Sequence, residues 1–199
     1  MNNVLPLLAI AIALAGSSAV WVGGAGQRSP KERMDVVQGN FSRGATAKRS
    51  LKVLSWNIQY GTNFEGIAEV IDREKPDIAL LQEVDFNARR SNRRNVAEEL
   101  ARRFELNYVF GIEFEELGQG SQKSPAYHGQ AILTAFPIRP SARVFRFQSQ
   151  TDFWKPHWYV PNWAIFQRRL GERMALVATV DAGGAPLIIY NTHLESRGS

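Results

Sequence analysis

The sequence predicts an α/β domain with parallel strands, and three observations support this prediction. Residues 51–57, 76–83 and 186–193 are apolar runs of strand length, and each ends in polar side chains. The pattern between the first two runs is that of an amphipathic helix, which makes a strand–helix–strand unit. With 199 residues, 44% of them hydrophobic, the chain is long enough for one principal domain with a sizeable core.

Residues 1–22 are expected to form a signal peptide or a membrane anchor. The apolar run 4–14 is broken only by Pro6, and residues 17–19 are small, as at a signal-peptide cleavage site. No Lys or Arg precedes the run, and extending it to Val22 gives nearly the length of a membrane span followed by basic residues, which suits an uncleaved anchor. A buried structural segment is the remaining alternative. The protein is therefore expected to be exported, periplasmic or secreted, or membrane-anchored, on a side of the membrane that the sequence leaves open.

Residues 23–50 are expected to be a basic flexible linker, because they are rich in Gly, Ser and Arg and their apolar residues follow neither the helical nor the strand period. They hold six of the 24 Lys and Arg residues but only two of the 19 Asp and Glu residues. Residues 51–199 therefore carry 18 basic and 17 acidic side chains. The net charge of +5 says little about the substrate of this region, and its near-neutrality slightly disfavours a dedicated nuclease.

Two helices are expected after the first strand. Residues 62–65 have capping-box spacing, and the apolar face that follows must end before Pro76. A second apolar face predicts a helix at 95–104. Because strand–helix–strand units give parallel strands, Asn57 and Glu83 are expected at the same edge of the sheet, where ligands of open α/β sheets bind.

Five further strands are expected along the rest of the chain. They cover residues 107–113, 130–135, 141–147, 164–169 and 174–180. An aromatic loop at 151–161 is expected between the third and the fourth, and it suits stacking on bases, contact with lipid, or a loop with an apolar underside. Residues 181–185 predict a hairpin turn that leads into the strand at 186–193.

Glu83 is the most informative candidate for chemistry. It directly follows the apolar residues 78–81, where a partly desolvated carboxylate needs a cation or hydrogen-bond donors. A hard oxygen ligand of this kind suits Mg²⁺, which commonly takes one or two carboxylates and keeps its other positions for water and phosphate. The alternative is a glutamate at a strand end that is exposed to solvent or paired with an Arg.

Two other strand-end side chains are weaker candidates when each is considered alone. The amide of Asn57 can orient a phosphate or a second carboxylate, or it can bond turn backbone. His193 can donate to a phosphoryl oxygen or act as a general acid, or it can be structural. Four arginines at 89, 90, 93 and 94 either meet phosphate or begin the second helix in solvent, and Arg90 is the one nearest the predicted site.

Other chemistries fit the sequence less well, because it lacks their motifs. The chain has no cysteine, so it has no disulfide, no thiolate metal site and no cysteine nucleophile, and the compartment's redox state stays open. It also lacks the Gly-x-Ser-x-Gly elbow, the Walker A loop, the dinucleotide-binding glycine pattern and His-Glu-x-x-His.

Four segments in this order resemble the endonuclease/exonuclease/phosphatase superfamily of metal-dependent phosphoesterases. They are LSWN at 54–57, DIALLQEVD at 77–85, HGQAILTAFPI at 128–138 and NTHLES at 191–196. The resemblance covers about residues 51–199 and implies a four-layer α/β sandwich, in which two packed mixed β-sheets are flanked by helices.

The resemblance also implies roles for particular residues. Glu83 looks like the family's Mg²⁺ ligand, Asn57 like the amide that organises the metal and phosphate site, and His193 like the histidine that assists at the scissile phosphate. Arg90 matches a less universal basic, substrate-binding position. The implied reaction is hydrolysis of a phosphate ester with Mg²⁺ or Mn²⁺, and the substrate class spans nucleic acid, phospholipid and small phosphodiesters.

Two departures from the family pattern qualify this expectation. Gln130 stands where relatives usually have Asn, and the Gly-Asp-x-Asn and Ser-Asp-His segments that supply further carboxylates and a His–Asp pair are not found before Ser199. The sequence thus resembles the front half to two-thirds of a catalytic domain, and these 199 residues alone are expected to be inactive. The alternative function is a non-catalytic remnant or a membrane-tethered binding module, and the oligomeric state stays open.

Overall fold

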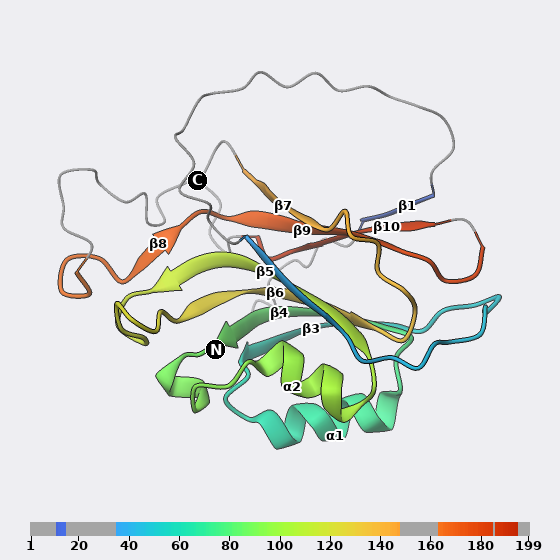
Figure 1. Cartoon of the computed structure of the whole chain (residues 1–199), viewed down its shortest axis with the longest axis horizontal. Helices are drawn as coiled ribbons and strands as arrows, with labels where there is room; N and C mark the ends of the chain where they lie inside the picture. The colour runs from blue at the N-terminus through green and yellow to red at the C-terminus, as the bar shows by residue number, and fades with distance from the viewer. Residues whose placement is uncertain (1–10, 15–34, 148–162, 185, 195–199) are drawn as a thin grey trace, which may run out of the picture.

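Two β-sheets pack face to face, and two helices cover the outer face of one of them (Figure 1). This arrangement is seen in a computed structural model, which describes residues 11–14, 35–147, 163–184 and 186–194. It confirms the expected α/β class with two packed sheets and flanking helices. Within the described residues both helices lie on the same sheet, so they account for three of the four expected layers.

The larger sheet has six strands and mixed direction. The strand order is β2-β5-β6-β4-β3, with β8 paired to the end of β5. Only the β3–β4 pair is parallel, as the strand–helix–strand pattern predicts, and the other pairs are antiparallel. The strands are β2 (Val36–Asn40), β3 (Val53–Tyr60), β4 (Ile78–Phe86), β5 (Asn107–Glu116), β6 (Tyr127–Thr134) and β8 (Arg169–Gly171).

The smaller sheet has the order β1-β10-β9-β7, and all its described pairs are antiparallel. The expected mixture of strand directions therefore applies to the larger sheet. The strands are β1 (Ala11–Leu14), β7 (Arg143–Arg146), β9 (Met174–Val180) and β10 (Leu187–Thr192). The predicted hairpin is confirmed, because β9 and β10 pair with Leu187 opposite Val180.

Both predicted helices are present, α1 (Phe64–Glu74) and α2 (Val96–Arg103). Each begins after an asparagine whose side chain accepts a hydrogen bond from the third backbone N–H that follows, which satisfies an otherwise unpaired donor. The cap of α1 is Asn63, so the capping box expected to start at Thr62 is wrong; the Thr62 hydroxyl instead donates to the carbonyl of Gln59.

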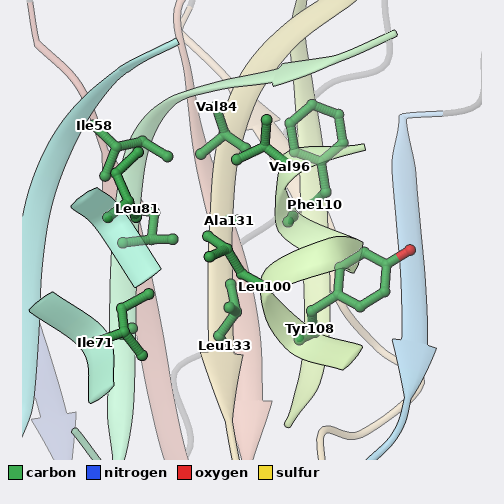
Figure 2. Packing of buried hydrophobic residues seen from close by; sticks show 14 of the residues in the cluster. Ile58, Ile71, Leu81, Val84, Val96, Leu100, Tyr108, Phe110, Ala131 and Leu133 are labelled. Carbon is green, nitrogen blue, oxygen red and sulfur yellow. The ribbon is translucent and has the colours of Figure 1, made fainter. Parts of the chain in front are cut away.

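The core has two parts, divided by the larger sheet. Apolar residues at alternate positions of β4, β5 and β6 face α1 and α2, and Figure 2 shows Leu100 packed among side chains from these strands. On the other face of the larger sheet, residues such as Leu80 and Ile132 pack in one cluster with residues of β9 and β10 such as Leu176. All three side chains have at most 1% exposure. The first part holds the helices on the larger sheet, and the second part holds the two sheets together.

Three sequence expectations need correction or lie outside the described residues. The linker prediction is wrong for residues 36–40, because these residues form β2, which pairs with β5 over five positions. The sequence VVQGN is too short to show the alternation of apolar and polar residues that predicts a strand. The strand expected at 164–169 is also wrong: residues 164–166 form a turn, and the strand is the shorter β8. The aromatic loop at 151–161 lies outside the described residues.

The expected leader at 1–22 is described only at β1, which pairs with β10. Within the part of the chain that the structure describes, neither α1 nor α2 has the length and apolarity needed to cross a membrane.

Candidate functional site at the ends of β3 and β4

A β-bulge in β4 aims the Glu83 side chain. Leu81 pairs with Ala131 and Val84 pairs with Gly129 on β6, so two residues of β4 lie opposite one residue of β6. Residues 79, 81 and 84 all belong to the core on the helix side, which shows that the bulge interrupts the alternation between faces. Without the bulge, Glu83 would follow Leu81 into that core.

A second bulge lies beside the first, on β3. Asn57 pairs with Gln82 and Tyr60 with Val84, so two residues of β3 lie opposite Glu83. Glu83 has φ 53°, and Gln59 and Tyr60 also have positive φ. Left-handed backbone is unfavourable for residues with a Cβ, and such strain is often found where a side chain is aimed at a functional site.

The carboxylate of Glu83 and the imidazole of His193 come together from opposite sheets. The Oε1 atom of Glu83 lies 3.8 Å from Nδ1 of His193, and the two side chains are 19% and 15% exposed. Within the described part of the chain, His193 is the one basic side chain within 4 Å of the Glu83 carboxylate, and its Nδ1 makes no hydrogen bond. The alternative of a freely exposed or Arg-paired glutamate is therefore not what the structure shows.

The side-chain amides of Gln82 and Asn191 fix the distance between the two sheets. Asn191 on β10 donates to the carbonyls of Leu81 and Ala131 at 3.0 and 2.9 Å, and it accepts from Gln82 at 2.7 Å. Both amides are buried. Because Gln82 precedes Glu83 and Asn191 lies two residues before His193, these hydrogen bonds set the approach of the carboxylate to the imidazole.

Asn57 lies beside this pair by strand register, opposite Gln82. Its Oδ1 accepts a hydrogen bond from the backbone N–H of Gln59 at 3.0 Å, which is the turn-bonding alternative expected from the sequence. Asn57 also lines a cavity of about 390 Å³ between β3 and the first turns of α1. Its role at a phosphate or metal remains a prediction.

Arg90 is held in a separate network of charged groups. Its guanidinium makes two hydrogen bonds of 2.7 Å to Asp85 and one of 3.1 Å to Glu116, and it stacks 3.7 Å over the ring of Tyr60. Burial would raise the pKa of the Asp85 carboxyl, but hydrogen bonds from Arg90 and His128 outweigh burial and lower it. The geometry gives Arg90 a structural role, and its contact with substrate remains a prediction.

A second buried charged pair lies near His193. Burial raises the pKa of Glu113, against the effect of Arg173, whose Nη1 lies 3.0 Å from the Glu113 carboxylate. Burial also lowers the pKa of His193, and this outweighs the opposite effect of the Glu83 carboxylate. A lowered pKa favours the neutral form of the His193 imidazole, which can donate one N–H and accept a proton.

The oxygen donors at this edge fit a magnesium ion held mainly by water and phosphate. Glu83 offers a carboxylate without a hydrogen-bond donor among the described residues, and the amide oxygen of Asn57 is the neighbouring candidate ligand. Hard oxygen donors in this small number are what Mg²⁺ uses in phosphate-handling sites. Groups of three or more His, Asp or Glu placed to hold a metal do not occur among the residues that the structure describes.

The residues that support the site are not among the candidates that the sequence predicts. Asp85 and His128 are buried and lie 3.1 Å apart, while Gln82 and Asn191 form the bridge between the sheets. Their signal was present, since a polar residue inside an otherwise apolar strand must find a partner when buried. The identity of each partner depends on tertiary contacts more than 40 residues apart in sequence.

The comparison with family models decides the family. Residues 54–190 match the model of the Endonuclease/Exonuclease/phosphatase family. The chain belongs to this family. The match spans β3 to β10, and so includes Asn57, Glu83 and Arg90. Phosphoesterases and nucleases of this family generally depend on divalent metal ions.

A structural relative carries the same family name. It is an endonuclease/exonuclease/phosphatase from Beutenbergia cavernae DSM 12333, with 19% sequence identity and a TM-score of 0.48. The similarity covers 76% of the present chain and 40% of that protein, so the chain spans about two fifths of its relative's length. No curated protein matches the chain.

Proposed function

We propose that this member of the Endonuclease/Exonuclease/phosphatase family hydrolyses a phosphodiester with Mg²⁺ or Mn²⁺ bound at Glu83. The observation that carries the proposal is the meeting of Glu83 and His193 from opposite sheets, with 3.8 Å between Oε1 and Nδ1. The two packed sheets bring a carboxylate and an imidazole to one edge, where they would serve as a metal ligand and a proton-transferring group in the same place.

Each residue has a defined part in this proposal. When bound, the metal ion would polarise the phosphoryl group. Glu83 and Asn57 would supply its oxygen ligands, and the neutral imidazole of His193 would donate a hydrogen bond to a phosphoryl oxygen or transfer a proton. Asn191 and Gln82 would keep the two halves of the site at a fixed separation through their buried hydrogen bonds.

The substrate proposal favours a lipid or small-molecule phosphodiester over a nucleic acid. Residues 51–199 carry nearly equal numbers of basic and acidic side chains, whereas nucleic-acid binding relies on a strongly positive surface. Export or membrane anchoring through residues 1–22 is part of the same proposal, because it would place the enzyme near lipids.

Hydrolysis of bis-p-nitrophenyl phosphate with and without Mg²⁺ tests the proposal, both on the 199-residue chain and on a longer product where the reading frame continues. The expected result is no turnover by the 199 residues and metal-dependent turnover by the longer product, which Glu83→Gln reduces by at least about 10²-fold, the effect of removing one strong electrostatic contributor. Metal-dependent turnover by the 199 residues would exclude the non-catalytic alternative and contradict their expected inactivity.

Glu69→Gln provides the matched control, because Glu69 is an exposed glutamate on α1. Calorimetric titration with Mn²⁺ gives a readout besides activity, and it should show weakened binding in the Glu83 variant alone. Unchanged activity and unchanged Mn²⁺ affinity in Glu83→Gln would disprove the metal assignment.

A further inference from the structure

Three large apolar side chains are exposed in one four-residue turn, residues 163–166. Trp163, Ile165 and Phe166 are 60%, 83% and 56% exposed. Among the described residues, six large hydrophobic side chains are exposed, and half of them are in this turn. Single exposed apolar residues need no explanation, but a contiguous group of this kind marks an interaction surface.

The exposed turn has a defined structure and a firmly held base. The backbone N–H groups of Phe166 and Gln167 both donate to the carbonyl of Trp163, and the rings of Trp163 and Phe166 stack with 5.7 Å between centroids. At its base, Arg169 is buried and lies 2.6 Å from the Glu116 carboxylate. The apolar side chains of residues 163–166 are therefore exposed to solvent on a turn whose following residues are anchored in the fold.

Cationic side chains lie beside the exposed turn. Arg168 lies two residues after Phe166 and is 58% exposed. Arg89 is also exposed, and it donates to the carbonyl of Gly118, in the loop that packs beside Ala164. The acidic partner of Arg168, Glu116, is itself buried. An apolar tip with exposed arginines beside it is complementary to a surface that is apolar inside and anionic outside.

The turn lies at the same edge of the larger sheet as Glu83. Strand β8 pairs with the carboxyl end of β5, and β5 runs in the same direction as β4 because both are antiparallel to β6. Figure 1 shows the orange turn that leads into β8 projecting from this end of the molecule. A surface bound by the turn would therefore face the edge that holds the candidate site.

We propose that residues 163–166 insert into the headgroup region of an anionic lipid bilayer. Indole and phenyl rings prefer this depth, and adjacent arginines are attracted to anionic headgroups. A projecting tip of four residues is small for a stable protein interface, which buries about 800 Å² on each partner. This binding surface is distinct from the proposed leader and does not depend on the proposed hydrolysis.

Because the 199-residue chain has no cysteine, one introduced cysteine gives a local probe in it. Ile165→Cys carries an environment-sensitive fluorophore, and Phe145→Cys, at a side chain 58% exposed on β7, is the matched control. Each labelled protein is mixed with vesicles of phosphatidylcholine and phosphatidylserine that contain a doxyl-labelled lipid. The local readout separates insertion of the turn from any attachment through residues 1–22.

The expected result is a blue shift and quenching at position 165 at least about fivefold stronger than at position 145. Pure phosphatidylcholine vesicles should give a clearly weaker signal, and Trp163→Ser with Phe166→Ser should lower the quenching about tenfold while circular dichroism stays unchanged. Equal quenching at the two positions, equal signals on neutral and anionic vesicles, or a response to single-stranded DNA alone would each overturn the proposal.

Discussion

Glu83 combines a strained backbone with an aimed side chain. Its φ of 53° is in the left-handed region, which costs a residue with a Cβ about 1 kcal/mol or more, whereas glycine adopts it readily. We therefore expect Glu83→Gly to raise the free energy of unfolding by about 1 kcal/mol. Urea denaturation of the variant and the unchanged protein at neutral pH measures this difference in the free energy of unfolding. A less stable variant would show that the carboxylate, and not the strain, dominates at this position.

Arg90 tests whether a predicted substrate contact is instead structural. Its guanidinium is paired with the buried carboxylates of Asp85 and Glu116, so Arg90→Met would leave the buried Asp85 carboxylate without a cation, while Glu116 would keep Arg169. We expect the free energy of unfolding to fall by about 3–5 kcal/mol, as for other broken buried ion pairs. Arg89→Met, at the exposed neighbour, should have little effect. A stable Arg90 variant with only a raised KM would support the substrate-binding role.

At the scale of elements, periodicity predicted more than strand-end geometry did. The strand–helix–strand unit and both helices follow from apolar spacing, because their faces pack on a sheet in the ordinary way. The strands expected to end at Asn57 and Glu83 continue through bulges to Tyr60 and Phe86. No residue type signals those bulges, since Gln59, Tyr60 and Glu83 adopt positive φ without being glycine.

Patterns of apolar residues also misled where their partner is not the protein core. The sequence predicts a strand at 164–169, yet Ile165 and Phe166, whose side chains are common in strands, are exposed in a turn. The charged pairs Asp85–Arg90 and Glu113–Arg173 could not be predicted either. Their carboxylates are buried by strands whose pairing depends on the whole sheet.

The start of the parallel β3–β4 pair gives a pH-dependent contribution to stability. Asp77 accepts hydrogen bonds from the Lys48 ammonium and the backbone N–H of Lys52 at 2.5 and 2.8 Å. Burial alone would raise the pKa of Asp77, but these hydrogen bonds outweigh it and lower the pKa below its ordinary value of 3.8. The stabilisation by the Asp77 carboxylate is therefore fully present above about pH 3.8 and is lost as the pH falls through the lower pKa of the folded state.

Asp77→Asn should consequently cost about 1 kcal/mol of unfolding free energy at pH 7, and the difference from the unchanged protein should shrink as the pH is lowered toward 3. Urea unfolding at a series of pH values measures both curves. Asp72→Asn, at an exposed position of α1, serves as the control. A difference that is the same at all pH values would mean that the Asp77 charge is not what stabilises the strand pair.

For the whole molecule, the packing of the two sheets is what creates the candidate site. Glu83 belongs to the larger sheet and His193 follows the last strand of the smaller one, so neither sheet alone contains the pair. The apolar layer around Leu80, Ile132 and Leu176 holds the sheets together, and Asn191 adds direct hydrogen bonds between them. Integrity of this layer is therefore a condition for any chemistry at the edge.

Whether residues 1–22 act as a leader or as part of the fold can be tested through the stability of the whole molecule. Strand β1 extends the smaller sheet at its edge through four pairs with β10, from Ala11 opposite Tyr190 to Leu14 opposite Leu187. A cleavable leader must be dispensable for the mature fold, whereas a structural strand must not be. Because β1 is short and pairs on one side only, we expect a chain of residues 23–199 to unfold within about 1 kcal/mol of the full chain.

Urea unfolding of the two chains, followed by circular dichroism, makes this comparison. The matched control removes β2 as well, in a chain of residues 41–199, which should be less stable because β2 pairs with β5 over five positions and packs Val37 against the helix-side core. A loss of more than about 3 kcal/mol on removal of residues 1–22 alone is the size expected for core residues, and it would identify β1 as part of the fold instead of a leader.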